Sequence, residues 1–203
     1  MSGMYETLLV EERDDRVVVT LHRPEARNAI SGLMIRELHA VCDLLERDPK
    51  FLLLTGQGGV FAGGAELAYA CDLRIAGPDA VFGNPEPGLG IIAAAGACWR
   101  LPELVGESVA KQVLLAGRNL DARAALAAGL VIDVVPADRL LDEAHALLDR
   151  MARSSAAALR LTKLVVDSPG AHPIADDLAQ AVLFEGPDKR ERMTRFLEKR
   201  SRA

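Results

Sequence analysis

A short apolar run, Phe51–Thr55, followed by the glycine-rich residues 56–59, constrains the fold of this chain most strongly. Such a run is typical of a strand that is buried on both faces and is followed by a turn. An amphipathic segment precedes it, in which Ser31 can cap a helix that ends by Asp48 and Pro49. A helix that leads into a buried strand favours an α/β fold.

Strand and helix signals alternate through the first part of the chain, and the pattern becomes mainly helical after Gly106. Residues 8–11 and 17–22 are typical of a strand hairpin with a polar turn. The later predicted strands are residues 73–76, 80–82 and 130–135. The later predicted helices are residues 66–70, 108–116, 138–152, 154–166 and 174 to the end, together with a segment capped by Asp121. No repeat or linker interrupts them. We expect one domain over 1–203, with a core at about 1–135 and a helical portion at about 136–203.

The composition is typical of a globular protein of ordinary size. Half of the 203 residues are hydrophobic, and no run approaches the roughly 18 apolar residues that a membrane-spanning helix needs. The net charge of −5 argues against general affinity for nucleic acids. The N-terminus lacks the pattern of an export signal, and the three widely spaced cysteines indicate neither a disulfide framework nor a zinc site. We therefore expect a cytoplasmic protein with no metal, no membrane and no nucleic-acid partner.

The C-terminal segment, residues 189–203, is basic although the whole chain is acidic. It contains seven Lys or Arg residues and only two acids, Glu191 and Glu198. Two interpretations remain open from charge alone. The segment could bind a phosphorylated small molecule, or it could be the solvated face of a helix.

Two glycines, Gly63 and Gly64, lead into a predicted helix that carries Glu66 in its first turn. Glycines allow a ligand to approach the backbone closely, and free N–H groups at a helix start stabilise negative charge. This is the arrangement of an oxyanion hole. A second acid, Glu86, stands between two prolines in a glycine-rich loop of the kind that often presents a side chain. Each feature alone is more often a turn or a solvated charge.

Together, these segments resemble the central signature of the enoyl-CoA hydratase/isomerase (crotonase) family. The resemblance rests on GGAELAYACDLRIAGPDAVFGNPEPGLG followed by RLPELVG, and it extends to LHRPEARNAIS, LLLTGQGGVF, GRNLDARAALAAGLVIDVV and FEGPDKRERMTRFLEKR. It therefore covers almost the whole chain. The family implies a crotonase-like spiral of repeated ββα units with a helical C-terminal portion, and assembly of that portion into homotrimers or dimers of trimers.

The resemblance also implies an activity and its residues. It assigns Glu66 and Glu86 to the two glutamates that add water across the double bond of a 2-enoyl-CoA, as in fatty acid metabolism. It assigns one backbone donor of the oxyanion hole to Gly63. It implies that Arg27, Asn28 and Ala29 lie along coenzyme A, with Lys199 near its phosphates. Coenzyme A is then part of the substrate, and no cofactor is expected.

The chain departs from the family in two places. Comparison with the family implies that about 40 residues are absent near residues 61 and 62, too many for a trimmed surface loop. They would include the first oxyanion donor, so we expect the sequence to be part of a longer chain, numbered without gaps. In the second departure, Ala93 and Ala94 replace a Pro-Gly pair beside the reacting water.

Three other functions remain open on this sequence. The same scaffold could serve an enoyl-CoA isomerase or a coenzyme A thioesterase, because both stabilise similar charge at the thioester. A non-catalytic member that binds acyl-CoA would also fit. Acyl chain length is not encoded in these motifs.

Overall fold

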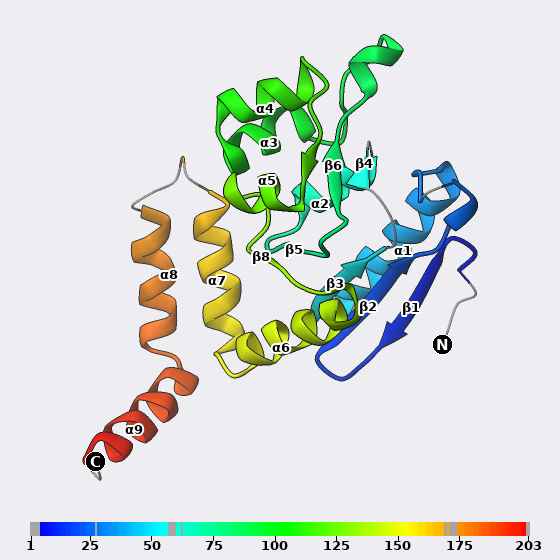
Figure 1. The fold of residues 1–203 in the computed structure, drawn as a ribbon. Coiled ribbons are helices and arrows are strands. Elements are labelled where there is room, and N and C mark those ends of the chain that lie inside the picture. Colours follow the sequence, from blue (N-terminus) through cyan, green and yellow to red (C-terminus); the bar gives the residue numbers. More distant parts are fainter. Residues whose placement is uncertain are drawn as a thin grey trace. The chain divides into compact units, whose positions relative to one another are not determined.

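The computed structural model describes residues 5–26, 28–56, 60–61, 63–168, 170 and 174–201. The chain divides into two compact units, Met1–His145 and Ala146–Ala203. The first unit contains the strands together with several helices, and the second is helical (Figure 1). The predicted α/β class with a helical C-terminal portion is confirmed.

The first unit begins with a sheet of three strands in the order β1-β2-β3. β1 (Leu8–Glu12) pairs antiparallel with β2 (Arg16–Leu21), which confirms the predicted hairpin. β2 pairs in parallel with β3 (Phe51–Thr55). The connection from β2 to β3 passes through η1 (Pro24–Ala26) and α1 (Gly32–Arg47), as a parallel pairing requires.

Helix α1 forms where the apolar spacing predicts it. The Ser31 side chain accepts a hydrogen bond from the Met34 backbone N–H at 3.2 Å, which satisfies one of the free donors at the helix start. Met34 and Val41 are buried against Val17 and Val19 of β2. Each such side chain contributes roughly 1.5–3 kcal/mol by leaving water, so this face of α1 holds the sheet in place.

The prediction that β3 is buried on both faces is wrong. Leu53 is buried, but Leu52 on the opposite face is 43% exposed. In the described part of the chain, β3 pairs only with β2 and stands at the edge of its sheet. An apolar run alone does not show whether a neighbouring layer covers the second face.

The rest of the first unit packs short strands and helices around a second core. The strands are β4 (Val60–Phe61), β5 (Ile75–Ala76), β6 (Val81–Gly83), β7 (Leu120–Asp121) and β8 (Asp133–Val134), and the helices are α2 (Gly63–Ala70), α3 (Ala97–Val105), α4 (Glu107–Leu114) and α5 (Ala122–Ala127). β6 lies between β4 and β7, and β5 pairs with β8. The core includes Leu101, Val113 and Leu130. η2 (Glu86–Leu89) follows β6.

The predicted strand at 130–135 is reduced to β8. Leu130 and Val131 are buried, and their N–H groups both donate to the Ala125 carbonyl at the end of α5. Their apolar side chains thus fill the core under a helix end, and they do not extend the strand pairing. Over only a few residues, the apolar composition of a strand does not differ from that of a non-strand segment that is buried in the core.

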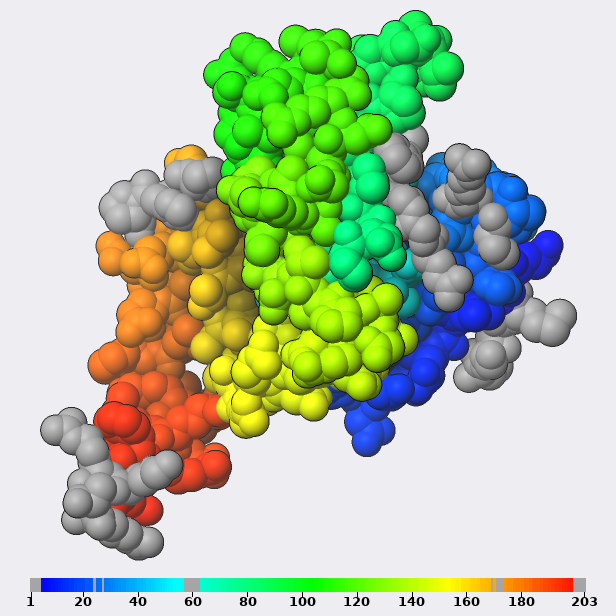
Figure 2. Space-filling model, viewed as in Figure 1, coloured from blue at the N-terminus to red at the C-terminus, as the bar shows by residue number. Residues whose placement is uncertain are grey.

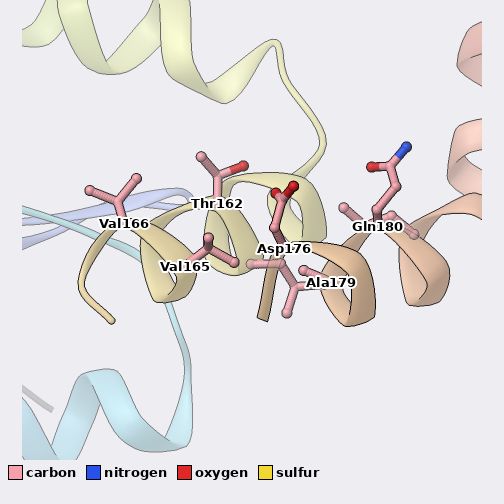
Figure 3. Close-up of a pocket in the computed structure, with 8 residues that line it drawn as sticks. Thr162, Val165, Val166, Asp176, Ala179 and Gln180 are labelled. Atoms are coloured by element: carbon pink, nitrogen blue, oxygen red, sulfur yellow. The ribbon is translucent and has the colours of Figure 1, made fainter. Parts of the chain in front are cut away.

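Helices make up the second unit. α6 (Leu140–Ala152) starts within the first unit after η3 (Ala137–Arg139), and α7 (Ala156–Val166), α8 (Ile174–Phe184) and α9 (Pro187–Ser201) follow. The expected single helix from residue 174 is broken before α9, because Pro187 disfavours a helical residue ahead of it and occupies a first-turn position well. α7 and α8 line a cavity of about 190 Å³ (Figure 3). Among the described helices, none is long and apolar enough to cross a membrane.

Candidate active site

Helix α2 places two polar side chains on its buried side. Glu66 is 8% exposed and Tyr69 is 3% exposed. Residues three apart on a helix share a face, so these two side chains lie next to each other. The predicted helix at 66–70 is confirmed and begins earlier, at Gly63.

Glu86 begins η2, directly after β6. The chain leaves β6 through Asn84 and Pro85, and Gly90 ends the turn in the left-handed region with a φ of 78°. The Glu86 side chain is 7% exposed, and its Oε2 atom accepts no hydrogen bond from any described residue. A buried carboxylate oxygen without a donor is costly and is uncommon outside functional sites.

The two carboxylates lie within electrostatic range of each other. Burial raises the pKa of Glu66, a hydrogen bond from the Ala94 backbone N–H lowers it, and the charge of Glu86 raises it further. The net effect is a pKa above the ordinary value of glutamate. Glu66 therefore keeps a proton to higher pH than a solvated glutamate does, as suits a group that exchanges protons with substrate.

Ala94 belongs to a strained segment between η2 and α3. Ala95 has a φ of 44° and Gly96 a φ of 92°, so two consecutive residues are left-handed, and the first of them is not glycine. Ala93 beside them is 4% exposed. Sequence reasoning placed a departure from the family at Ala93 and Ala94, but it did not predict that the Ala94 N–H contacts Glu66.

Tyr69 and Asn84 form a buried pair that the sequence did not reveal. The Tyr69 hydroxyl donates to Asn84 Oδ1 at 2.9 Å. Burial raises the pKa of the Tyr69 phenol, and the charges of Glu86 and Glu66 add to that rise. The two glutamates and this pair therefore form one buried polar cluster. The signal available in the sequence was a tyrosine three residues after Glu66.

Gly63 opens α2, so its N–H has no partner within the helix. A Cβ at this position would meet two carbons of the Ile30 side chain at 2.8 Å. The described structure thus gives a packing reason for this glycine, in addition to the ligand approach that the sequence suggests. Gly64 next to it has open space around its Cα.

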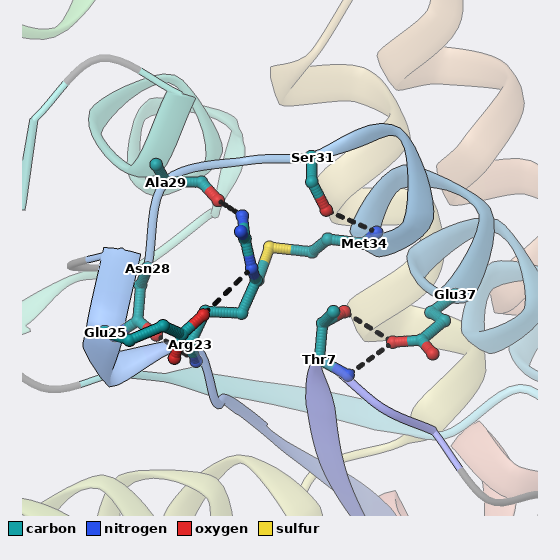
Figure 4. Close-up of polar contacts among 8 residues, drawn as sticks. All are labelled: Thr7, Arg23, Glu25, Asn28, Ala29, Ser31, Met34 and Glu37. Atoms are coloured by element: carbon teal, nitrogen blue, oxygen red, sulfur yellow. Dashed lines mark hydrogen bonds and ion pairs between the residues drawn. The ribbon is translucent and has the colours of Figure 1, made fainter.

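The loop before α1 is held by its own hydrogen bonds (Figure 4). The Arg23 backbone N–H donates to Asn28 Oδ1 at 2.7 Å, and the Arg23 guanidinium donates to the Ala29 carbonyl at 2.6 Å. Asn28 is left-handed, with a φ of 57°, and is 8% exposed. Its side chain shapes the loop, whereas Ala29 is exposed. Arg27 lies outside the described residues.

An apolar cavity of about 580 Å³ adjoins the cluster in the first unit. Pro87, the neighbour of Glu86, and Ala93, the neighbour of Ala94, line it, although neither glutamate does. The end of η2 and the residues after it project from the first unit (Figure 2), and the side chains of Leu89 and Ile92 are each 75% exposed.

The basic C-terminal segment forms α9. Arg192 pairs with Asp188 and Arg195 with Glu191, one helical turn apart. These ion pairs partly neutralise the positive charge that would otherwise attract a phosphate. The side chain of Lys199 lies outside the described residues. In the described ranges, no group of three His, Cys, Asp or Glu side chains could hold a metal ion.

Comparison with known proteins identifies the family. A family model described as enoyl-CoA hydratase/isomerase matches residues 55–203. The chain belongs to the enoyl-CoA hydratase/isomerase family. A probable enoyl-CoA hydratase of Mycobacterium tuberculosis is 32% identical, over 97% of each chain. A crotonyl-CoA hydratase of Syntrophomonas wolfei is 30% identical, over 97% of this chain and 96% of that protein. A crystal structure of enoyl-CoA hydratase from Geobacillus kaustophilus matches with a TM-score of 0.90 at 27% identity, over 97% of each chain.

This sequence has no residues at many positions of its relatives in the hydratase/isomerase family. The alignment with the Mycobacterium tuberculosis relative runs over 254 positions, whereas 97% of 203 residues is about 197, so about 57 positions have no residue from this chain. The sequence predicts an absent segment of about 40 residues near Phe61 and Ala62. Ala62 lies outside the described residues, so the chain geometry there does not test that prediction.

Proposed function

We propose that this enzyme adds water to a 2-enoyl-CoA and forms a 3-hydroxyacyl-CoA. The observation that carries the proposal is the pair of buried carboxylates, Glu66 and Glu86, coupled electrostatically on α2 and η2. Relatives named enoyl-CoA hydratase and crotonyl-CoA hydratase support the same reaction.

The arrangement suggests how the reaction proceeds. One carboxylate accepts a proton from water as the water oxygen bonds to C3 of the substrate, and the electron pair of the double bond moves to the thioester oxygen. The N–H of Gly63 stabilises that negative charge. A carboxylic acid of the pair then gives a proton to C2, which restores the thioester. The raised pKa of Glu66 suits this residue to hold and release a proton during the exchange.

The proposal includes the groups around the reaction. Arg27, Asn28 and Ala29 would lie along coenzyme A, and Lys199 near its phosphates. The reaction needs acids and N–H donors, so we propose no metal or redox cofactor. We further propose a cytoplasmic homotrimer or dimer of trimers that acts in fatty acid metabolism. Light scattering combined with size-exclusion chromatography measures the assembly.

Product analysis over a series of 2-enoyl-CoA chain lengths tests the function. Hydration removes the absorbance of the conjugated thioester and gives a product that is one water molecule heavier. A product of unchanged mass would instead indicate an isomerase, and release of free coenzyme A a thioesterase. Binding of acyl-CoA without any turnover would contradict the proposal in favour of a non-catalytic role.

A further inference from the structure

Asn84 is a buried amide with only half of its hydrogen-bonding capacity used. It lies between β6 and η2 and is 2% exposed, so water outside the fold does not reach it. Its Oδ1 atom accepts from the Tyr69 hydroxyl at 2.9 Å. Its Nδ2 atom, which carries two hydrogens, has no partner among the described residues. Burying a donor without an acceptor is unfavourable, because the donor has lost its hydrogen bonds to water.

Tyr69 fixes which way this amide faces. The phenol stays protonated in the working pH range, because burial and two nearby negative charges raise its pKa. A protonated phenol that donates to Oδ1 leaves Nδ2 turned to the other side of the amide. Nδ2 is a hydrogen-bond donor, and the nearby carboxylates of Glu66 and Glu86 are strong hydrogen-bond acceptors.

A complementary atom lies two residues further along the chain. Glu86 Oε2 is buried and accepts no hydrogen bond in the part of the chain that the structure describes. One atom is a donor and the other an acceptor, yet they do not bond directly. A water molecule that accepts from Nδ2 and donates to Oε2 satisfies both, and buried waters are found where polar groups lack partners.

We propose that Asn84, oriented by Tyr69, is a positioning residue that holds a water molecule against Oε2 of Glu86. This inference rests on the proposed function, because the water is then available beside the carboxylate that takes part in hydration. Tyr69 acts only through Asn84. Removing either group disturbs the water and Glu86 and leaves the coenzyme A contacts unchanged.

Two nearly isosteric changes and one truncation test the role in turnover: Tyr69→Phe, Asn84→Asp and Asn84→Ala. Tyr69→Phe and Asn84→Ala should each lower kcat about tenfold, which is the effect expected from the loss of about one buried hydrogen bond. KM should stay within about twofold of the value for the unaltered protein. The double variant Tyr69→Phe/Asn84→Ala should be no slower than Asn84→Ala. Asn84→Asp should be as slow as Asn84→Ala, because it keeps the shape but loses the donor.

Val113→Ala is the control for a purely structural effect. Val113 is fully buried on α4 and lies outside the polar cluster, so this change should lower the melting temperature without a matching loss of kcat. If Tyr69→Phe keeps full kcat, or if the two losses multiply in the double variant, the inference is wrong. Should Asn84→Asp fail to fold, the Tyr69→Phe result still decides.

A high-resolution crystal structure of the unaltered protein separates this inference from the proposed function. We expect a water molecule within hydrogen-bonding distance of both Asn84 Nδ2 and Glu86 Oε2, and its loss in Asn84→Ala. If the position is empty while the enzyme hydrates 2-enoyl-CoA, the inference fails and the function stands. If the water is present but no enoyl-CoA is hydrated, the proposed function fails.

Discussion

The backbone N–H of Ala94 donates a hydrogen bond to the carboxylate of Glu66. The segment before α3 therefore contacts the buried side of α2 at a proposed catalytic acid. This bond favours the ionised form of Glu66, whereas burial and the charge of Glu86 oppose ionisation and outweigh it. The site thus stores unfavourable electrostatic energy that is absent from the unfolded chain.

Replacing Glu66 by Gln should stabilise the fold at high pH. The folded pKa of Glu66 is raised, so the stability that its proton contributes is complete at low pH and is lost as pH rises through the folded pKa. Above that pKa the fold contains a buried Glu66 carboxylate, and glutamine at this position carries no charge that has to be buried. Melting temperatures of Glu66→Gln and of the unaltered chain should therefore agree near pH 4 and separate above neutrality, by roughly 2–4 °C per kcal/mol. Glu103→Gln, at an exposed position of α3, is the matched control variant. A constant offset in Glu66→Gln would contradict the interpretation.

Glu37 should have the opposite pH dependence. Burial alone would raise its pKa, but hydrogen bonds from the Thr7 hydroxyl and from the Glu6 and Thr7 backbone N–H groups lower it. Figure 4 shows the two bonds from Thr7. Its stabilising contribution is present above the unfolded pKa and is lost as pH falls through the folded one. Glu37→Gln should cost about 1.5–3 kcal/mol at pH 7 in urea unfolding, with a smaller cost in acid. An equal cost at both pH values would refute this.

Gly63 and Gly64 should respond differently to alanine. A Cβ on Gly63 would overlap Ile30, and overpacking costs about 1–3 kcal/mol. Gly64→Ala meets nothing within 4 Å and should be neutral or stabilising by up to about 1 kcal/mol, through helix propensity. Chemical unfolding measures both. The double variant Gly63→Ala/Ile30→Ala should lose less stability than the sum of the two single variants, because the smaller side chain at position 30 leaves room for the new Cβ. Losses that simply add would show that contact with Ile30 is not the cause.

Arg74 should be a large contributor to stability. Its guanidinium donates to the carbonyls of Leu130, Ala68 and Cys71, which joins the end of α2 to the segment before β8. Arg74→Met leaves three partly buried carbonyls without this donor and should cost about 3 kcal/mol. Arg123→Met, on the exposed side of α5, should change stability by less than about 0.5 kcal/mol. Similar urea midpoints for the two variants would contradict this role.

The local elements were largely predictable, because their signals are local. The Ser31 cap and the apolar spacing after it predict α1, and Asp121 accepts from Ala124 at the predicted start of α5. The boundaries near Leu130 were not predictable, because a core segment and a strand have similar apolar composition over a few residues. The exposure of Leu52 depends on what packs above it, and the sequence does not encode this locally.

The site was predictable only in part. The two acids were found from glycines, prolines and the family signature, and the structure places both in buried positions. Their roles stay a prediction. The Tyr69–Asn84 bond and the Ala94 contact were missed, because each joins segments far apart in the chain through tertiary packing. A tyrosine on a helix is usually a packing residue, and nothing nearby in the sequence indicates its acceptor.

The central claim is that Glu66 and Glu86 together hydrate a 2-enoyl-CoA. The most direct measurement is kcat for Glu66→Gln, Glu86→Gln and the exposed control Glu103→Gln, with melting temperatures to confirm folding. Each catalytic variant should lose about 10²–10⁴-fold in kcat, the usual contribution of a positioned acid or base, and the control should match the unaltered chain. Turnover within threefold of normal in either folded catalytic variant would contradict the two-carboxylate mechanism.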